Sequence, residues 1–106
     1  MSSIRKRFDN YRIYYMTGGA ENPLINCYDG DTYVGKLCFH DEDAPLPPNA
    51  VVPDEIIYLR YKVSQFNDVV GMLRNESPLF LRISEPSLIG YIGTSEAEPV
   101  GEEESL

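Results

Sequence analysis

The segment Ile56–Asn75, IIYLRYKVSQFNDVVGMLRN, decides the fold class, because a strand pattern changes into a helix pattern within it. Apolar and polar residues alternate over Ile56–Val63, which is typical of a strand with one buried face. Beyond Ser64, apolar residues recur at the spacing of one buried helical stripe: Phe66, Val69, Val70 and Leu73. We therefore expect a helix over Ser64–Arg74, with Ser64 as its N-cap and Asn75 closing it in the left-handed conformation.

Strand patterns lie on both sides of this segment. Stretches rich in β-branched and aromatic residues, bounded by turn residues, occur at Tyr11–Met16, Leu24–Tyr28, Thr32–His40, Pro78–Ser84 and Leu88–Gly93. The prediction is an α+β fold: a small, strongly bent antiparallel β-sheet or partly open barrel of about six strands, with one α-helix between strands 4 and 5. The core facing the helix should contain Leu59, Tyr61, Leu79, Leu81, Ile83 and Ile92.

Charge and length divide the chain into three expected regions. Residues 1–7 hold three of the bases and are expected to form a flexible basic arm. Residues 8–93 are expected to form a single β-rich domain, since 106 residues leave room for one core. Residues 94–106 contain five glutamates and no base, which predicts an acidic disordered tail. The formal net charge of −8 argues against nucleic acid as a partner, because an acidic protein repels a polyanion.

The location of the protein is predicted from its apolar runs and its start. No apolar run exceeds four residues, far short of the roughly 20 that span a bilayer, so no membrane partner is expected. Residues 1–5 lack the apolar stretch of a secretory signal, which indicates the cytoplasm. The stretch Asp41–Glu55 contains four prolines and is expected to be a long exposed loop.

Residue types that support catalysis are few. A hairpin turn centred on Asp29-Gly30 pairs Cys27 with Thr32 and leaves it roughly 20 Å from Cys38, so two reduced thiols are expected. The single histidine, His40, is followed by three carboxylates, Asp41, Glu42 and Asp43, and the weak candidates for metal ligands are His40, Asp41 and Asp43. Consecutive residues do not converge on one ion without a structured loop, so neither a metal site nor a cofactor is expected. A thiol or metal-dependent enzyme built around His40 and Cys38 is the third hypothesis for function.

Tyrosine and basic side chains gather on the predicted strands and suggest binding instead. The candidate binding residues are Arg12, Tyr14, Tyr58, Arg60 and Lys62. Tyr and Arg bury a large area and still offer hydrogen bonds, which is typical of binding hot spots. The leading hypothesis is a non-catalytic small binding module that engages an unidentified protein through an exposed Tyr/Arg-bearing sheet face or a sheet edge. The alternative is single-stranded nucleic-acid binding, because bases can stack on such a platform.

Overall fold

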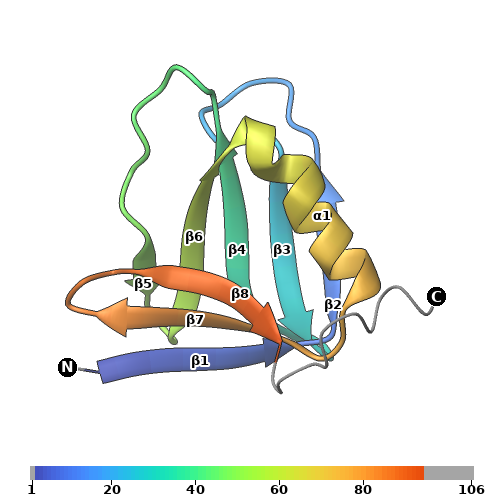
Figure 1. Cartoon of the computed structure of the whole chain (residues 1–106), viewed down its shortest axis with the longest axis vertical. Coiled ribbons are helices and arrows are strands. Elements are labelled where there is room, and N and C mark those ends of the chain that lie inside the picture. Colours follow the sequence, from blue (N-terminus) through green and yellow to red (C-terminus); the bar gives the residue numbers. More distant parts are fainter. Residues whose placement is uncertain (1, 95–106) are drawn as a thin grey trace, which may run out of the picture.

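The computed structural model describes residues 2–94, which form one α-helix, one short 3-10 helix and eight strands (Figure 1). In chain order the elements are β1 (Ser2–Phe8), β2 (Asn10–Tyr14), β3 (Leu24–Asp29), β4 (Thr32–His40), β5 (Ala50–Val52), β6 (Ile56–Lys62), η1 (Val63–Gln65), α1 (Phe66–Asn75), β7 (Leu79–Glu85) and β8 (Gly90–Thr94). The α+β class is confirmed. The strands belong to two separate sheets, so the predicted six-stranded sheet or partly open barrel is wrong.

The larger sheet has the strand order β2-β3-β4-β6-β5 and contains one parallel pair. β4 and β6 run in the same direction, with Leu37 opposite Leu59. Parallel neighbours require a crossover, which residues 41–55 provide by returning the chain to the starting end of the sheet. The prediction of a wholly antiparallel sheet fails at this pair. The crossover also contains β5, which pairs with β6 at the sheet edge, so it is not a plain loop.

The smaller sheet has the order β1-β7-β8 and is antiparallel. Its first strand comes from the residues predicted to be a flexible arm, and that prediction is wrong. Ile4 pairs with Ile83 and Phe8 pairs with Leu79, and both apolar side chains of β1 face the core. Phe8 is 2% exposed. The basic residues hid this pattern: Arg5 and Arg7 occupy the alternate, exposed positions, and Lys6 stands between Ile4 and Phe8 on their own side of the strand.

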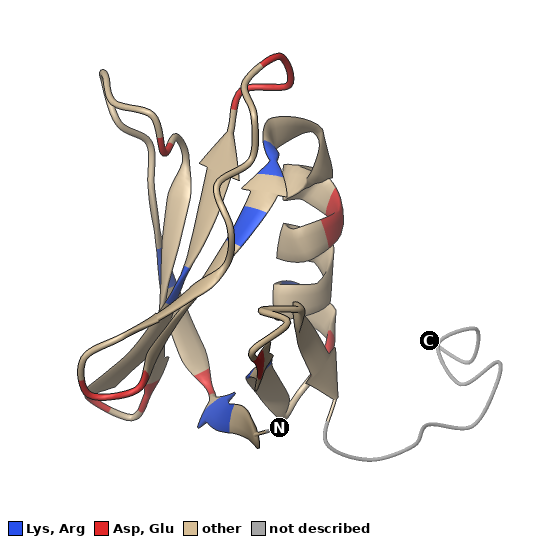
Figure 2. Ribbon diagram, turned by 90° about the vertical axis from the view of Figure 1, so that its left-hand side faces the viewer, with Lys and Arg blue, Asp and Glu red and all other residues tan. Residues whose placement is uncertain are grey.

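The two sheets and α1 enclose one apolar core. Figure 2 shows the larger sheet and α1 as separate layers with the smaller sheet below them. The helical stripe is confirmed, since Val69, Val70 and Leu73 are buried and the Phe66 ring meets the Phe39 ring edge to face at 5.1 Å between centroids. The six other core residues predicted all belong to this cluster: Leu59, Leu79, Leu81 and Ile83 as buried members, Tyr61 and Ile92 as partly buried ones.

Both ends of the helix differ from the prediction. Residues 63–65 form η1, and the backbone N–H of Ser64 donates to the Glu42 carboxylate at 2.7 Å, so Ser64 is not the N-cap of α1. At the other end, Asn75 is the last helical residue and its side-chain amide donates to the carbonyl of Gly71 at 2.8 Å. The asparagine therefore contacts the last turn of the helix through its side chain, without a left-handed backbone.

A β-bulge in β4 changes which side chains face the core. Cys27 pairs with Gly35, but the next residue, Tyr28, pairs with Tyr33, so Val34 is an extra residue on β4. Val34 joins the buried core, and Tyr33 lies beside Tyr28 with ring centroids 5.8 Å apart. Simple alternation predicts the reverse, because one inserted residue inverts the faces of everything beyond it. The hairpin also closes at Asp29 opposite Thr32, so the predicted register was wrong.

Two expectations concern the remaining parts of the chain. The predicted acidic tail, 94–106, lies outside the described residues apart from Thr94, the last residue of β8. Within residues 2–94, no helix has the length and hydropathy needed to cross a bilayer.

Candidate functional site

The five predicted binding residues all lie on the face of the larger sheet that points away from α1, here named the outer face. Strand register aligns its side chains in rows across four strands: Arg12, Asn26, Lys36 and Tyr58 in one row, and Tyr14, Leu24, Cys38 and Arg60 in the next. Lys62 continues the outer face on β6, opposite His40 of β4. The five residues therefore share one face of the sheet, and their role in binding stays a prediction.

Contacts within the molecule occupy part of this face. Glu21, from the loop between β2 and β3, accepts hydrogen bonds from Lys36 Nζ at 2.8 Å and from Arg60 Nη1. The Arg60 side chain is only 15% exposed. The Lys62 ammonium donates to the backbone carbonyls of Glu42 and Ala44 in the crossover. Arg60 and Lys62 therefore hold two loops against the sheet, whereas Arg12 and Tyr14 remain exposed.

The Glu21 cluster is charged at neutral pH. Burial raises the pKa of the Glu21 carboxyl, but the hydrogen bonds from Lys36 and Arg60 outweigh it and the net pKa lies below its usual range. Burial likewise lowers the pKa of Lys36, and its bond to Glu21 overcomes this, so the net pKa is raised. Both shifts favour the ionised forms, so Glu21 forms ion pairs that hold its loop against β4 and β6.

The thiols are poor nucleophiles. Cys27 and Cys38 are free and buried, and they lie on opposite faces of the sheet, Cys27 in the core and Cys38 on the outer face. Burial, followed by the Glu21 carboxylate, raises the pKa of the Cys38 thiol to about 11, and burial raises the pKa of Cys27 further. Because the thiolate is the reactive form, neither side chain is activated at neutral pH.

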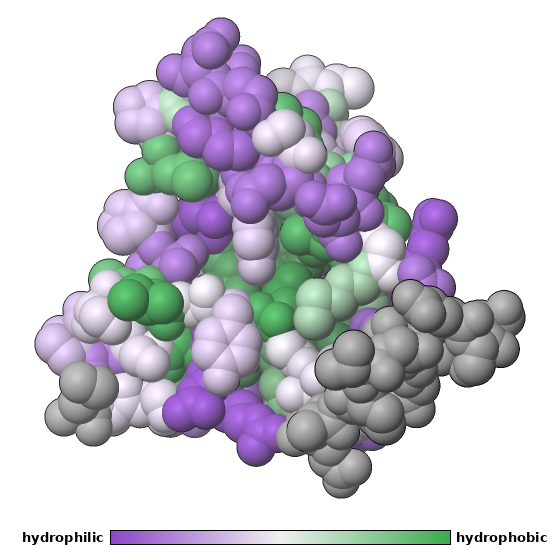
Figure 3. Space-filling model, in the orientation of Figure 1, coloured by the Kyte–Doolittle hydropathy of each residue, from purple (hydrophilic) through white to green (hydrophobic). Residues whose placement is uncertain are grey.

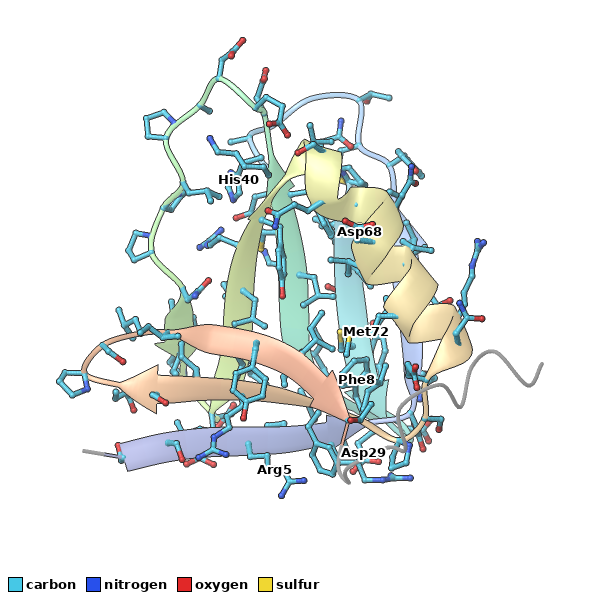
Figure 4. The ribbon with its side chains drawn as sticks, in the orientation of Figure 1. Arg5, Phe8, Asp29, His40, Asp68 and Met72 are labelled. Atoms are coloured by element: carbon cyan, nitrogen blue, oxygen red, sulfur yellow. The ribbon has the colours of Figure 1, made fainter. Side chains whose placement is uncertain are left out.

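His40 is the last residue of β4, where the crossover begins (Figure 4), and it is 4% exposed. Burial, followed by the charge of Arg60, lowers its pKa, so the imidazole is neutral at pH 7. Its Nε2 has no hydrogen-bond partner among residues 2–94, and the imidazole lines a pocket of about 600 Å³ between residues 19–22 and the crossover.

The other candidate metal ligands do not converge on His40. Asp41 accepts a hydrogen bond from the backbone N–H of Asp43, and no group of three metal-binding side chains forms within the described range.

A groove between α1 and β8 was not predicted from the sequence. It has a volume of about 350 Å³ and is lined by Tyr61, Gln65, Asp68, Val69, Met72, Gly90, Tyr91 and Ile92. Figure 3 shows apolar side chains at the floor of a hollow in this face, and Figure 4 shows Asp68 and Met72 on the helix beside it. One signal was present in the sequence. The groove residues of η1 and α1 are spaced at i, i+3, i+4 and i+7, beside the buried stripe, with which they share Val69: Gln65, Asp68, Val69 and Met72.

The edge of β8 that faces away from β7 borders this groove. β8 pairs only with β7 among the described strands, so alternate N–H and C=O groups point away from the sheet. Its sequence, Gly90–Thr94, carries no charge. The other sheet edges are protected: β1 carries Arg5, Lys6 and Arg7, β2 carries Arg12, and β5 has three residues followed by a proline. β8 is therefore the edge best suited to accept another strand.

Comparison with known proteins supplies no relative from which a function could be transferred. No family model matches the chain, and neither a curated protein nor a solved structure matches it. The groove and the edge of β8 that faces away from β7 are therefore the basis for the proposal of function.

Proposed function

We propose that the protein is a non-catalytic binding module that takes up an extended segment of a partner protein as an added strand beside β8. The observation that carries the proposal is that Gly90–Gly93 of β8 carry no charge and pair only with β7 among the strands of residues 2–94, next to an apolar groove under α1. In this mode of recognition, main-chain hydrogen bonds to the edge give affinity and side-chain pockets give specificity. It retains the protein-binding role expected from the sequence and moves it from the outer face to a sheet edge.

The lining of the groove defines the side chain that it would take. Val69, Met72 and Ile92 provide apolar surface, and the thioether of Met72 adapts its shape to different partners. Successive side chains of an added strand point in opposite directions, so every second residue of the ligand would face the groove. We expect a large aliphatic or aromatic residue at the position that enters it.

Charge selects a basic segment as the occupant. Among the residues lining the groove, Asp68 alone is charged, and the chain as a whole has a formal charge of −8. A lysine or arginine flanking the apolar anchor would meet Asp68. A second copy of the chain fits less well, because residues 90–94 contain no cation and two chains of the same charge repel.

The test begins with selection of peptides from a random display library against the full chain. Selected peptides should alternate apolar and polar residues and include a basic residue. A fluorescein-labelled selected peptide should bind the Met72→Lys variant at least about tenfold more weakly, because the new cation fills the groove. Asp68→Asn should weaken binding by about two- to fivefold, the range of an exposed ion pair.

Met16→Lys is the matched control, since Met16 is exposed in the loop after β2 and lies outside the groove. It should bind the peptide like the parent chain. Hydrogen exchange should show added protection at β8 amides on binding. Equal affinity for the Met72→Lys variant, protection at β1 in place of β8, or a β8-paired homodimer in solution would each overturn the proposal.

A further inference from the structure

The smaller sheet has an unusual arrangement of cations on the face that points away from the core. β1 and β7 pair so that Arg5 lies directly opposite Arg82. Like charges directly opposite each other destabilise a strand pair. Within residues 2–94, the five ion pairs closer than 4.0 Å involve neither of these guanidinium groups. Their charges are therefore not balanced by a neighbouring carboxylate of the described fold.

Both guanidinium groups are nevertheless held in place. The Cζ of Arg5 lies 3.7 Å from the centroid of the Phe80 ring. Arg82 donates from Nη1 to the Tyr91 hydroxyl at 3.3 Å and from Nη2 to the Ser3 hydroxyl at 3.2 Å. Stacking uses the face of the Arg5 guanidinium, so its in-plane N–H donors stay available to a ligand. The arginines are pre-positioned by neutral partners.

The two arginines line a small open pocket. Its volume is about 220 Å³, and it is bounded by Arg5, Phe80, Arg82, Tyr91, Gly93 and Thr94. Figure 4 shows Arg5 on the side of β1 that points away from the core. The neighbouring Arg7 is different, because it pairs with Asp29 at 2.7 Å and its charge is balanced. The pocket thus combines polar hydroxyl and backbone groups with two cations that form no ion pair within residues 2–94.

We propose that this pocket binds the phosphate group of a small ligand between Arg5 and Arg82. A phosphate carries nearly two negative charges at neutral pH and would balance both guanidinium groups. The planar fork of arginine matches phosphate oxygens and donates two parallel hydrogen bonds to them. The pocket shares Tyr91 with the peptide groove, but neither arginine lines that groove, so the arginine variants and the Met72 variant test the two proposals separately.

The test is an NMR titration of the full chain with inorganic phosphate and, in a second arm, phenyl phosphate. Saturable shifts at the side chains and amides of residues 5, 82 and 91 are expected, with weaker binding as salt is raised. Arg5→Gln and Arg82→Gln should each weaken binding by at least about tenfold, since each removes a charge-assisted bidentate contact. The two arms separate free phosphate from a phosphate ester as the preferred form.

Arg12→Gln is the matched control, because Arg12, like Arg5, lies over an aromatic ring, with its Cζ 5.6 Å from the centroid of the Tyr28 ring. It should bind phosphate like the parent chain. Removal of one of two opposed cations should leave the melting temperature unchanged or raised, so lost binding would not reflect unfolding. The same phosphate affinity in Arg5→Gln and Arg82→Gln, equal binding of acetate, or binding of an oligonucleotide without binding of phosphate would overturn the proposal.

Discussion

Glu21 connects parts of the molecule that are far apart in the sequence. Its carboxylate pairs with Lys36 of β4 and Arg60 of β6. The next residue, Asn22, donates its backbone N–H to the carbonyl of Phe39 at 2.8 Å and fixes the same loop to the sheet. Because Lys36 and Arg60 pair with this loop carboxylate, they stabilise the fold and are not available to a ligand on the outer face.

At the residue scale, Glu21→Gln should lower the free energy of unfolding by about 1–3 kcal/mol at neutral pH, because two largely buried cations lose their anion. Urea denaturation measures this change. The folded-state pKa of Glu21 is lowered from 4.5, so its contribution is present above that value and is lost as the pH falls through the folded-state pKa. Stability of the variant should thus fall less steeply below about pH 5.

Glu55→Gln is the control for this prediction. Glu55 pairs with Lys6, but its side chain is 63% exposed, and an exposed pair contributes about 0–1 kcal/mol. Equal destabilisation by the two substitutions would show that the Glu21 cluster has no special role.

At the scale of elements, two glycines lie in contrasting surroundings. Gly35 is in β4 beside the bulge, where a Cβ would lie 2.2 Å from Leu81 Cδ1 and 2.7 Å from the carbonyl oxygen of Ile57. The leucine can rotate, but the carbonyl belongs to β6 and is fixed by the sheet. Gly71 is in α1, and a Cβ there would meet nothing within 4 Å.

We therefore expect Gly35→Ala and Gly71→Ala to change stability in opposite directions. Gly35→Ala should destabilise by about 1–3 kcal/mol through overpacking. Gly71→Ala should stabilise the protein by up to about 1 kcal/mol, because alanine has a higher helix propensity and reduces the conformational entropy of the unfolded chain. Thermal and urea denaturation of the two variants in parallel measure both signs. Stabilisation by Gly35→Ala would contradict the close contact between β4 and β6.

At the scale of the whole molecule, both sheets share one core, and Leu81 of β7 is fully buried in it. The single β-rich domain over residues 8–93 remains a prediction that unfolding can test. We expect one cooperative transition, with tyrosine fluorescence and circular dichroism coinciding. Leu81→Ala should cost about 2–5 kcal/mol and reduce amide protection in β3 and β4 as much as in β1 and β7.

Ile89→Ala is the matched control, since Ile89 is 69% exposed and its truncation removes little buried surface. It should leave the unfolding midpoint nearly unchanged. Loss of protection confined to β1, β7 and β8 in Leu81→Ala would show that the two sheets unfold separately.

Local patterns in the sequence were sufficient for α1, for β2, β3, β4, β6, β7 and β8, and for much of the core. The stripe Phe66, Val69, Val70 and Leu73 and the alternation around Leu59 identify the faces that α1 and β6 bury. Alternation within one strand was also sufficient to place Tyr58, Arg60 and Lys62 on one face, whereas the pairing of β2 with β6 through β3 and β4 placed Arg12 and Tyr14 on that same face. These features depend on residues close in sequence, whose side-chain directions repeat with a fixed period.

Pairing between distant segments was decided only by the tertiary structure. It made β1 a strand of the smaller sheet, ran β4 and β6 in parallel, and inserted Val34 as a bulge. It also brought Glu21 to Arg60 and set β8 beside α1, which created the groove. No local period encodes these contacts, because they arise from the competition of all strands for partners and of all apolar faces for one core.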